Sequence, residues 1–280
     1  MQFQYLGTGA AEGIPAVFCN CAICKEAAKK GGRDIRTRSQ SMINDDLLID
    51  LPPDTYMHKL QHGLDLTKIR YLIVTHMHMD HFYPQELTIR GSGYSHDMVS
   101  EYLDIYCAKE TRDFYFSAAA WEASPDTNRT LNWHVLTPFE PVQFGSYTIV
   151  PLPASHMHEG NQPFLYHITD ADGKQVLYLH DSGYYKDEVW DYLEALKTPV
   201  DLVSYDGTSG AQETDHGHHM GFSEVFRVHS RMLEEGIVDG HTKCVLNHFS
   251  HNGRLMYEDM VKLAEAENML VSYDGMKLDI

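Results

Sequence analysis

The chain has 280 residues, of which 43% are hydrophobic, and carries a formal net charge of −18 from 40 acidic and 22 basic residues. This length can bury the core of one large domain or two small ones. Binding to phosphate backbones or anionic membranes needs clustered Lys and Arg, so the charge argues against large nucleic acids as partners. No apolar run reaches the ~18 residues of a membrane span. The N-terminus also lacks the pattern of a signal peptide, so we expect a cytoplasmic protein.

Strand-like runs alternate with helical patterns along the chain. Strands are predicted at 3–6, 47–50, 70–75, 103–107, 147–152, 164–168, 175–180, 201–206 and 243–248. Helices are predicted at 22–30, 54–62, 109–119, 186–197, 222–235 (ended by Gly236) and 255–268. Residues 269–278 predict two edge strands around Asp274-Gly275. This succession predicts an α/β architecture with two sheets under helices. We expect one domain over 1–280, with an inserted cap around 83–135.

The run from Thr75 to His81 holds three imidazoles and one carboxylate, directly after a strand-like segment. His76 and His78 alternate with Met77, so both side chains point the same way from an extended backbone. Asp80 and His81 follow where the chain turns. One metal ion can take the first pair and a second ion the other. Each ion needs three or four ligands, so the motif requires partners elsewhere in the chain.

Three further candidate ligands follow strand-like runs downstream. They are His156, Asp181 and His248, each placed where loops gather at a site. Asp181 is predicted to bridge the two metal ions, holding them about 3.5–4 Å apart. Its neighbour His180 should point to the opposite face, and we interpret it as a core residue or as a support for a ligand.

Five cysteines are an odd number, and three of them form the sequence Cys19-Asn20-Cys21-Ala22-Ile23-Cys24. Without a secretory signal, metal binding is favoured over disulfides. Three thiolates at this spacing suit a tetrahedral zinc ion, with His251 as the fourth ligand. The alternatives are three thiols packed in a loop, or redox-active thiols.

The H-x-H-x-D-H run after a strand, followed by a histidine, an aspartate and a histidine in that order, resembles the metallo-β-lactamase fold superfamily. The resemblance covers nearly the whole chain, from Gly7-Thr8-Gly9 to Asp274-Gly275. It implies an αββα sandwich of two mixed sheets, with the site at one edge. It also implies one metal ion on His76, His78 and His156. A second ion would lie on Asp80, His81 and His248, with Asp181 bridging.

Two local features narrow the branch of the superfamily. The three cysteines with His251 resemble the PhnP-type phosphoribosyl cyclic phosphodiesterases, which carry a structural zinc of this kind. The segment His216-Gly217-His218-His219-Met220-Gly221 precedes a helix, where similar phosphodiesterases and tRNA 3′-processing nucleases place a histidine that assists the scissile phosphate. His219 aligns best and His218 is close behind; the alternative is a solvated polar loop. The chain has neither the cysteine at 181 of a β-lactamase nor the glutamate at 78 of a flavodiiron site.

The favoured hypothesis is a phosphodiesterase for a small cyclic or nucleotide-like phosphate, with two zinc or manganese ions and one structural zinc. The ion pair would generate a hydroxide, which Asp80 orients, and His219 would be the general acid. One alternative is a hydrolase of lactones, thioesters or amides; another is a metal-binding accessory protein with little catalysis. Asp206, at a strand end, is either a partner of a ligating histidine or part of an ordinary turn. The sequence is also compatible with a homodimer.

Overall fold

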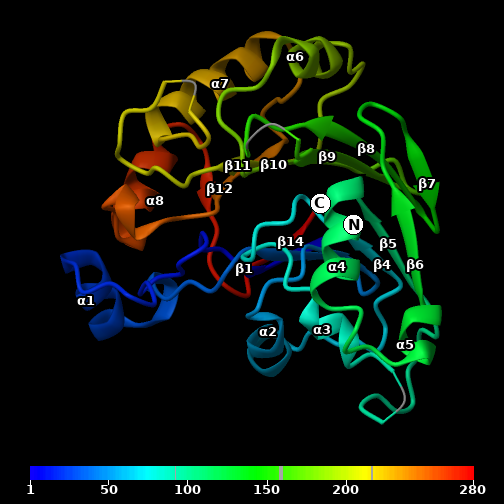
Figure 1. Cartoon of the computed structure of the whole chain (residues 1–280). Helices are drawn as coiled ribbons and strands as arrows, with labels where there is room; N and C mark the ends of the chain where they lie inside the picture. The colour runs from blue at the N-terminus through cyan, green and yellow to red at the C-terminus, as the bar shows by residue number, and fades with distance from the viewer. Residues whose placement is uncertain (92, 158–159, 216) are drawn as a thin grey trace.

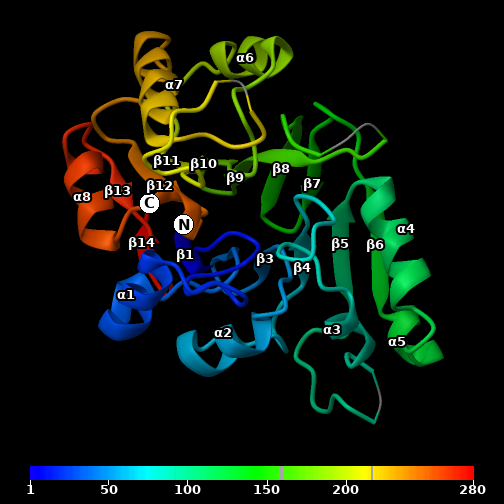
Figure 2. The same ribbon diagram turned by 60° about the vertical axis from the view of Figure 1, so that its left-hand side comes forward.

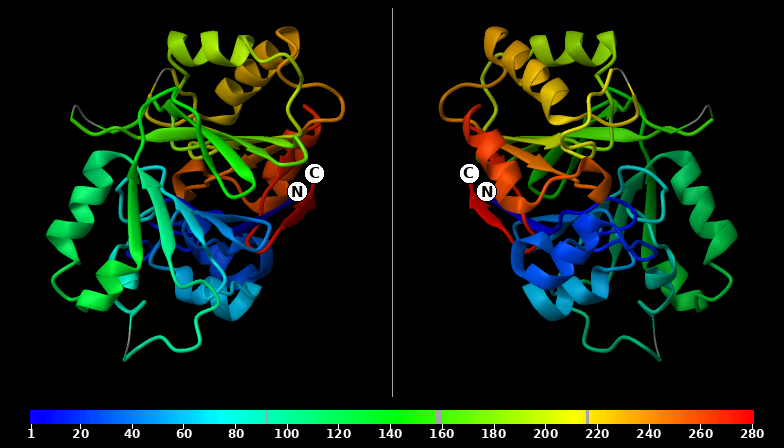
Figure 3. Two further views of the ribbon diagram at one scale, coloured as in Figure 1. Left: turned by 90° about the vertical axis from the view of Figure 1, so that its right-hand side faces the viewer. Right: turned by 90° about the vertical axis from the view of Figure 1, so that its left-hand side faces the viewer.

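The computed structural model describes residues 1–91, 93–157, 160–215 and 217–280. Two sheets of seven strands face one another, and helices lie on their outer faces, as Figures 1 and 3 show. The predicted αββα sandwich is therefore confirmed. No helix in these ranges has the length and apolar character needed to cross a bilayer.

The first sheet has the strand order β14-β1-β2-β3-β4-β5-β6. Its strands are β1 (Gln2–Gly7), β2 (Gln40–Ile43), β3 (Leu47–Ile49), β4 (Tyr71–Ile73), β5 (Leu103–Cys107), β6 (Leu131–Val135) and β14 (Lys277–Asp279). In this order, the neighbouring strands from β14 through β1 and β2 to β3 pair antiparallel, and those from β3 through β4 and β5 to β6 pair parallel. The segment 83–135, expected as an inserted cap, thus contributes two strands to this sheet.

The second sheet has the order β13-β12-β11-β10-β9-β8-β7. Its strands are β7 (Val142–Phe144), β8 (Tyr147–Pro153), β9 (Phe164–Asp170), β10 (Gln175–Leu179), β11 (Leu202–Asp206), β12 (Lys243–Asn247) and β13 (Leu270–Val271). Strands β7 to β10 pair antiparallel, and β10 to β13 pair parallel. The two predicted C-terminal strands are edge strands of different sheets. The turn at Asp274-Gly275 therefore carries the chain from one sheet to the other.

The helices lie between the strands along the chain and outside the two sheets in space (Figure 2). They are α1 (Ala22–Lys30), α2 (Thr55–His62), α3 (Gln85–Thr88), α4 (Lys109–Ala118), α5 (Pro125–Arg129), α6 (Asp187–Glu194), α7 (Phe222–Glu234) and α8 (Tyr257–Glu265). Gly236 follows α7 with a φ of 70°, which confirms it as the glycine that ends this helix. The unpredicted elements, among them α3, α5 and β7, are too short to show a period.

The interface between the two sheets is a layer of aromatic and aliphatic side chains that carries a few polar links. The hydroxyl of Tyr5, a fully buried residue of β1, donates to Ser204 Oγ of β11 at 3.0 Å. The buried Tyr166 hydroxyl of β9 donates to Val74 O at 2.7 Å, just beyond β4. A buried hydroxyl costs free energy unless it is hydrogen-bonded, so these contacts favour one register of the sheets. The second contact lies two residues before His76.

A buried polar cluster joins the N-terminal loop to the C-terminal turn beside β1. Arg36 Nη1 donates to Thr8 Oγ1 at 2.7 Å and to Ser272 O at 2.9 Å. The Asp274 carboxylate accepts from the Thr8 hydroxyl at 2.6 Å and from Thr37 N at 2.7 Å. Asp274 therefore satisfies several donors of the buried Thr8 and the half-buried Thr37.

We expect Asp274→Ala to lower the free energy of unfolding by roughly 2–4 kcal/mol, because the donors of the buried Thr8 and the half-buried Thr37 lose their acceptor. Urea denaturation followed by circular dichroism measures this change. Asp279→Ala on the exposed strand β14 is the control and should change the value by less than about 0.5 kcal/mol. Equal effects of the two substitutions would contradict the role of the cluster.

Candidate metal centre

The seven predicted ligands lie together at one edge of the sandwich, each just beyond the end of a strand. The run His76 to His81 follows β4, His156 follows β8, Asp181 follows β10 and His248 follows β12. Both sheets therefore contribute to the centre. Phe164 N in the second sheet donates to Thr75 O beyond the first at 2.9 Å, which ties the sheets together beside the ligands.

A first group of ligand atoms consists of three imidazole nitrogens. His76 Nε2 lies 2.9 Å from His78 Nδ1, and His156 Nε2 lies 3.1 Å from the same His78 atom. Ligand atoms around a tetrahedral zinc ion lie about 3.4 Å apart, so the three nitrogens are spaced to share one ion. Burial lowers the pKa of His76 far below its usual value and that of His156 to about 4. The neutral rings can offer their lone pairs to an ion.

A second group forms beside the first. His81 Nε2 lies 3.1 Å from His248 Nε2. Asp80 Oδ2 lies 3.3 Å from His81 Nε2 and 3.7 Å from His248 Nε2. These residues are buried. Two imidazoles and a carboxylate at this spacing suit a second divalent ion.

Asp181 reaches both groups. Its Oδ2 atom lies 2.7 Å from His81 Nε2 and 3.2 Å from His76 Nε2. Its Oδ1 atom is buried; His248 Nδ1 and His219 Nδ1 lie 3.1 and 3.4 Å away, but neither contact has the geometry of a hydrogen bond. A buried carboxylate oxygen without a donor is costly, whereas a cation would satisfy it. The donor set therefore fits two divalent ions with Asp181 between them.

Asp50, directly after β3, is a functional residue that the sequence analysis did not single out. Its Oδ2 accepts from His81 Nδ1 at 2.7 Å, and its Oδ1 accepts from Thr75 N at 2.8 Å. The carboxylate thus orients the His81 ring so that Nε2 faces the other ligands. The one signal for Asp50 in the sequence is its place at the end of a predicted strand, shortly before Pro52-Pro53. An aspartate at such a place can equally belong to an ordinary turn.

Three residues of the centre have left-handed backbone conformations. Asp50, Asp181 and His248 have φ values of 66°, 60° and 63°. Such conformations cost roughly 1–3 kcal/mol each in residues other than glycine, and they persist only where the surroundings hold them. Asp50 and His248 directly follow strands β3 and β12, and Asp181 comes two residues after β10. The strained turn aims its side chain at the cluster instead of along the strand.

His219 lies at the mouth of the cluster, half-buried. Its Nδ1 atom is 3.1 Å from Asp206 Oδ2 and 3.4 Å from Asp181 Oδ1. Burial lowers the pKa of His219, but the carboxylates of Asp206, Asp181 and Asp80 together outweigh burial and raise the pKa to about 9. His218 presents its carbonyl oxygen to His156 Nδ1 at 3.3 Å. His218 and His219 were the two candidates for the histidine that assists the phosphate. The structure brings the ring of His219 to the carboxylates of Asp206 and Asp181. His216 lies outside the described residues.

Asp206, at the end of β11, holds several loops of the centre at once. Its fully buried carboxylate accepts from Asp181 N and from Thr208 N, each at 2.9 Å, in addition to its contact with His219. Thr208 Oγ1 in turn lies 2.7 Å from His248 Nδ1. Asp206 therefore supports the bridging aspartate and the mouth histidine. His180 belongs to neither ligand group; its buried ring packs on Tyr178 at 3.9 Å and stacks on the His248 ring at 6.1 Å, as expected of a core residue or of a support for a ligand.

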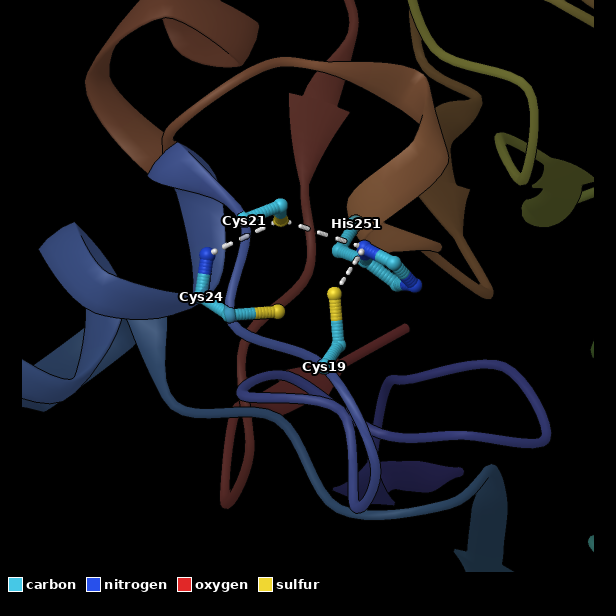
Figure 4. Close-up of side chains that lie close together, drawn as sticks. All are labelled: Cys19, Cys21, Cys24 and His251. Atoms are coloured by element: carbon cyan, nitrogen blue, oxygen red, sulfur yellow. Dashed lines mark hydrogen bonds between the residues drawn. The ribbon is translucent and has the colours of Figure 1, made fainter.

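The second candidate metal site joins the N-terminal loop to the chain beyond β12 (Figure 4). His251 Nδ1 lies 3.4 Å from Cys21 Sγ and 3.6 Å from Cys19 Sγ, and the ligand atoms of these residues and Cys24 lie within 4.8 Å of one another. Hydrogen bonds from the Cys24 backbone and from His251 lower the pKa of Cys21 to about 6. A thiolate at neutral pH suits zinc. His251 is three residues past His248, so this site would anchor the loop that carries a ligand of the first centre.

The arrangement of strands and ligands has the metallo-β-lactamase fold. Residues 46–242 match the family model described as a Beta-lactamase superfamily domain, and the chain belongs to this superfamily. A diphosphatase from the PhnP family has a similar structure, with a TM-score of 0.72 and 19% identity, covering 100% of this chain and 97% of that one. Zinc-bound PqqB from Methylobacterium extorquens has a TM-score of 0.71 and 16% identity, with 100% of both chains covered. The short form of human tRNase Z has a TM-score of 0.66 and 17% identity, covering 100% and 99%.

Among curated proteins, the chain is 26% identical over 285 residues to an octanoyltransferase of Porphyromonas gingivalis (strain ATCC BAA-308 / W83). The match covers 99% of this chain and 51% of that protein. The chain therefore spans about half the length of this relative.

We expect Asp50→Ala to weaken metal binding by about 10–100-fold although Asp50 is not itself a ligand, because His81 loses the acceptor that orients its ring. Competition with a chromophoric chelator measures the affinity. Asp45→Ala, an exposed change in the turn before β3, is the control and should bind metal as the unaltered protein does. Unchanged affinity in Asp50→Ala would show that His81 needs no such support.

Cys21→Ser should remove one zinc ion per chain and leave two ions at the histidine and aspartate centre. The unfolding temperature should also fall, because the N-terminal loop loses its link to His251. Elemental analysis and thermal unfolding give the two readouts. Cys107→Ala, at a cysteine of β5 that belongs to neither ligand group, is the control for the metal content. An unchanged metal content in Cys21→Ser would contradict the thiolate site.

Proposed function

We propose that the protein is a metal-dependent hydrolase that cleaves a phosphodiester bond in a small cyclic or nucleotide-like phosphate. The observation that carries this proposal is the position of His219 beside the bridging Asp181, at the exposed side of the ligand cluster. The similarity to a PhnP-family diphosphatase and to tRNase Z supports a phosphate substrate. The net charge of −18 favours a small substrate over a large RNA.

His76, His78 and His156 would hold one ion, and Asp80, His81 and His248 the other, with Asp181 between them. Bound there, two divalent ions lower the pKa of a water molecule and neutralise phosphoryl charge. Asp80 places its carboxylate at the ligand cluster and would orient the attacking water. Asp50 and Asp206 keep His81 and His219 in position.

His219 acts as the general acid in this proposal. Its Nδ1 atom faces the carboxylates of Asp206 and Asp181, so Nε2 is the atom left to face a substrate. The Asp206 carboxylate beside Nδ1 favours the protonated ring. Nε2 can therefore donate a proton to the leaving alkoxide oxygen as the bond to phosphorus breaks.

We expect His219→Ala to reduce the turnover of an alkyl phosphodiester by about 10²–10⁴-fold, because an alkoxide leaves poorly without a proton donor. The loss should be much smaller with bis-p-nitrophenyl phosphate, whose phenolate leaves without protonation. His218→Ala is the control and should lose little with either substrate. Steady-state rates with manganese or zinc give the comparison.

Two outcomes would contradict the proposal. An equal loss with both leaving groups would remove His219 from the role of acid. No turnover of any phosphodiester by protein with both ions bound, shown by elemental analysis, would reject a phosphodiesterase.

A hydrolase of acyl thioesters is the second candidate, favoured by the match to an octanoyltransferase over half of that relative. An octanoyl group is attached through a carbonyl carbon, which the same activated water can attack. A thiolate leaves without protonation, so this activity should survive His219→Ala. Hydrolysis of an octanoyl thioester by the unaltered protein and by this variant therefore separates the two candidates.

A further inference from the structure

A cavity of about 370 Å³ lies on the helix side of the first sheet. Its floor consists of Leu48 of β3, Leu72 of β4 and Leu103 of β5. Helices α2 and α3 form its walls together with Ile89, Arg90, Tyr94, Ser95 and Met98. None of the seven ligands of the metal centre lines it. The cavity is therefore separate from the site described above.

The lining of this cavity is aliphatic. Beyond the three leucines of the floor, the walls contain Leu51, Leu66, Ile69, Leu87 and Met98. Protein interiors are close-packed, and a space of this size is in the range of small-molecule pockets. It has room for on the order of a dozen water-sized atoms. The two aromatic residues, Tyr56 and Tyr94, are 61% and 74% exposed and so belong to the mouth.

The two basic residues at the cavity differ in whether they already form hydrogen bonds within the protein. Arg90 Nη2 donates to Ser100 O at 2.7 Å, and its Nη1 donates to Thr130 Oγ1 at 2.8 Å. Lys59 of α2 is exposed; its charge helps to lower the pKa of Asp65, but it forms no ion pair or hydrogen bond with the described residues. Lys59 is thus the cation that remains available to a ligand. Glu86 of α3 also lines the cavity and is the competing acidic group.

We propose that this cavity binds a medium-length saturated chain that carries a carboxylate, with the chain among the leucines and the carboxylate at Lys59. The absence of aromatic rings from the described floor and walls favours a flexible chain over a planar ring, which would stack on such rings. The apolar lining supplies most of the affinity, and Lys59 selects the head group.

Isothermal titration of the metal-loaded protein with hexanoate, octanoate and decanoate tests the proposal. Burying each added methylene contributes about 0.8 kcal/mol of binding free energy. The affinity should therefore rise up to about fourfold per methylene until the cavity is full. Lys59→Ala should weaken octanoate binding severalfold and leave octanol binding unchanged. Lys68→Ala, at a nearby lysine that does not line the cavity, is the control.

Filling the cavity gives an independent test. Leu66→Trp should abolish octanoate binding, whereas Leu60→Trp on the exposed face of α2 should retain it. Met98→Trp fills the cavity from the opposite wall. It is used instead of Leu66→Trp if Leu66→Trp does not fold, as shown by the loss of a cooperative unfolding transition. Absence of binding to the unaltered protein, affinity independent of chain length, or equal loss in both leucine variants would overturn the proposal. The assignment of a carboxylate head group would be overturned if octylamine bound more tightly than octanoate and if Glu86→Gln removed this preference.

Discussion

The structure depends on the burial of four carboxylates at one edge of the sandwich. Asp50, Asp80, Asp181 and Asp206 are each at most 4% exposed. Desolvating a carboxylate costs several kcal/mol unless opposite charge or hydrogen-bond donors surround it. Imidazoles and backbone amides supply part of this compensation, and the divalent ions that the cluster fits would supply the rest. The histidines, the hydrogen-bonded loops and the strained turns all serve this concentration of negative charge.

The two sheets have to be held in a set position because each supplies only part of the cluster. The run from His76 to His81 follows the first sheet, whereas Asp181 and His248 follow the second. The aromatic layer between the sheets and its few polar links set their spacing. Tyr166 is one such link, since its hydroxyl reaches Val74 O beside the start of the ligand run. The candidate thiolate site connects the N-terminal loop to the segment after His248.

Much of the fold and of the ligand set was predictable because the relevant signals are local. Alternating apolar runs marked β5 and β12 closely, and the spacing of His76, His78 and Asp80 is itself the chemical signal. The short strands β2, β6 and β7 were missed because three to five residues are too few to show a clear period. Asp50 was missed for another reason. Its role depends on contact with His81, 31 positions away, and nothing in its own surroundings in the sequence distinguishes it from a turn residue.

The sequence by itself determined the donor types, their local spacing and their order along the chain, because these are properties of residues and short segments. It also predicted a sandwich with its site at one edge, through the resemblance of that motif to a known superfamily. Only the tertiary structure decided which carboxylate oxygen reaches both ligand groups and which loop histidine faces the bridging aspartate. These outcomes depend on how strand ends of two separate sheets meet. His81 and His248 lie 167 residues apart in the chain and 3.1 Å apart in space.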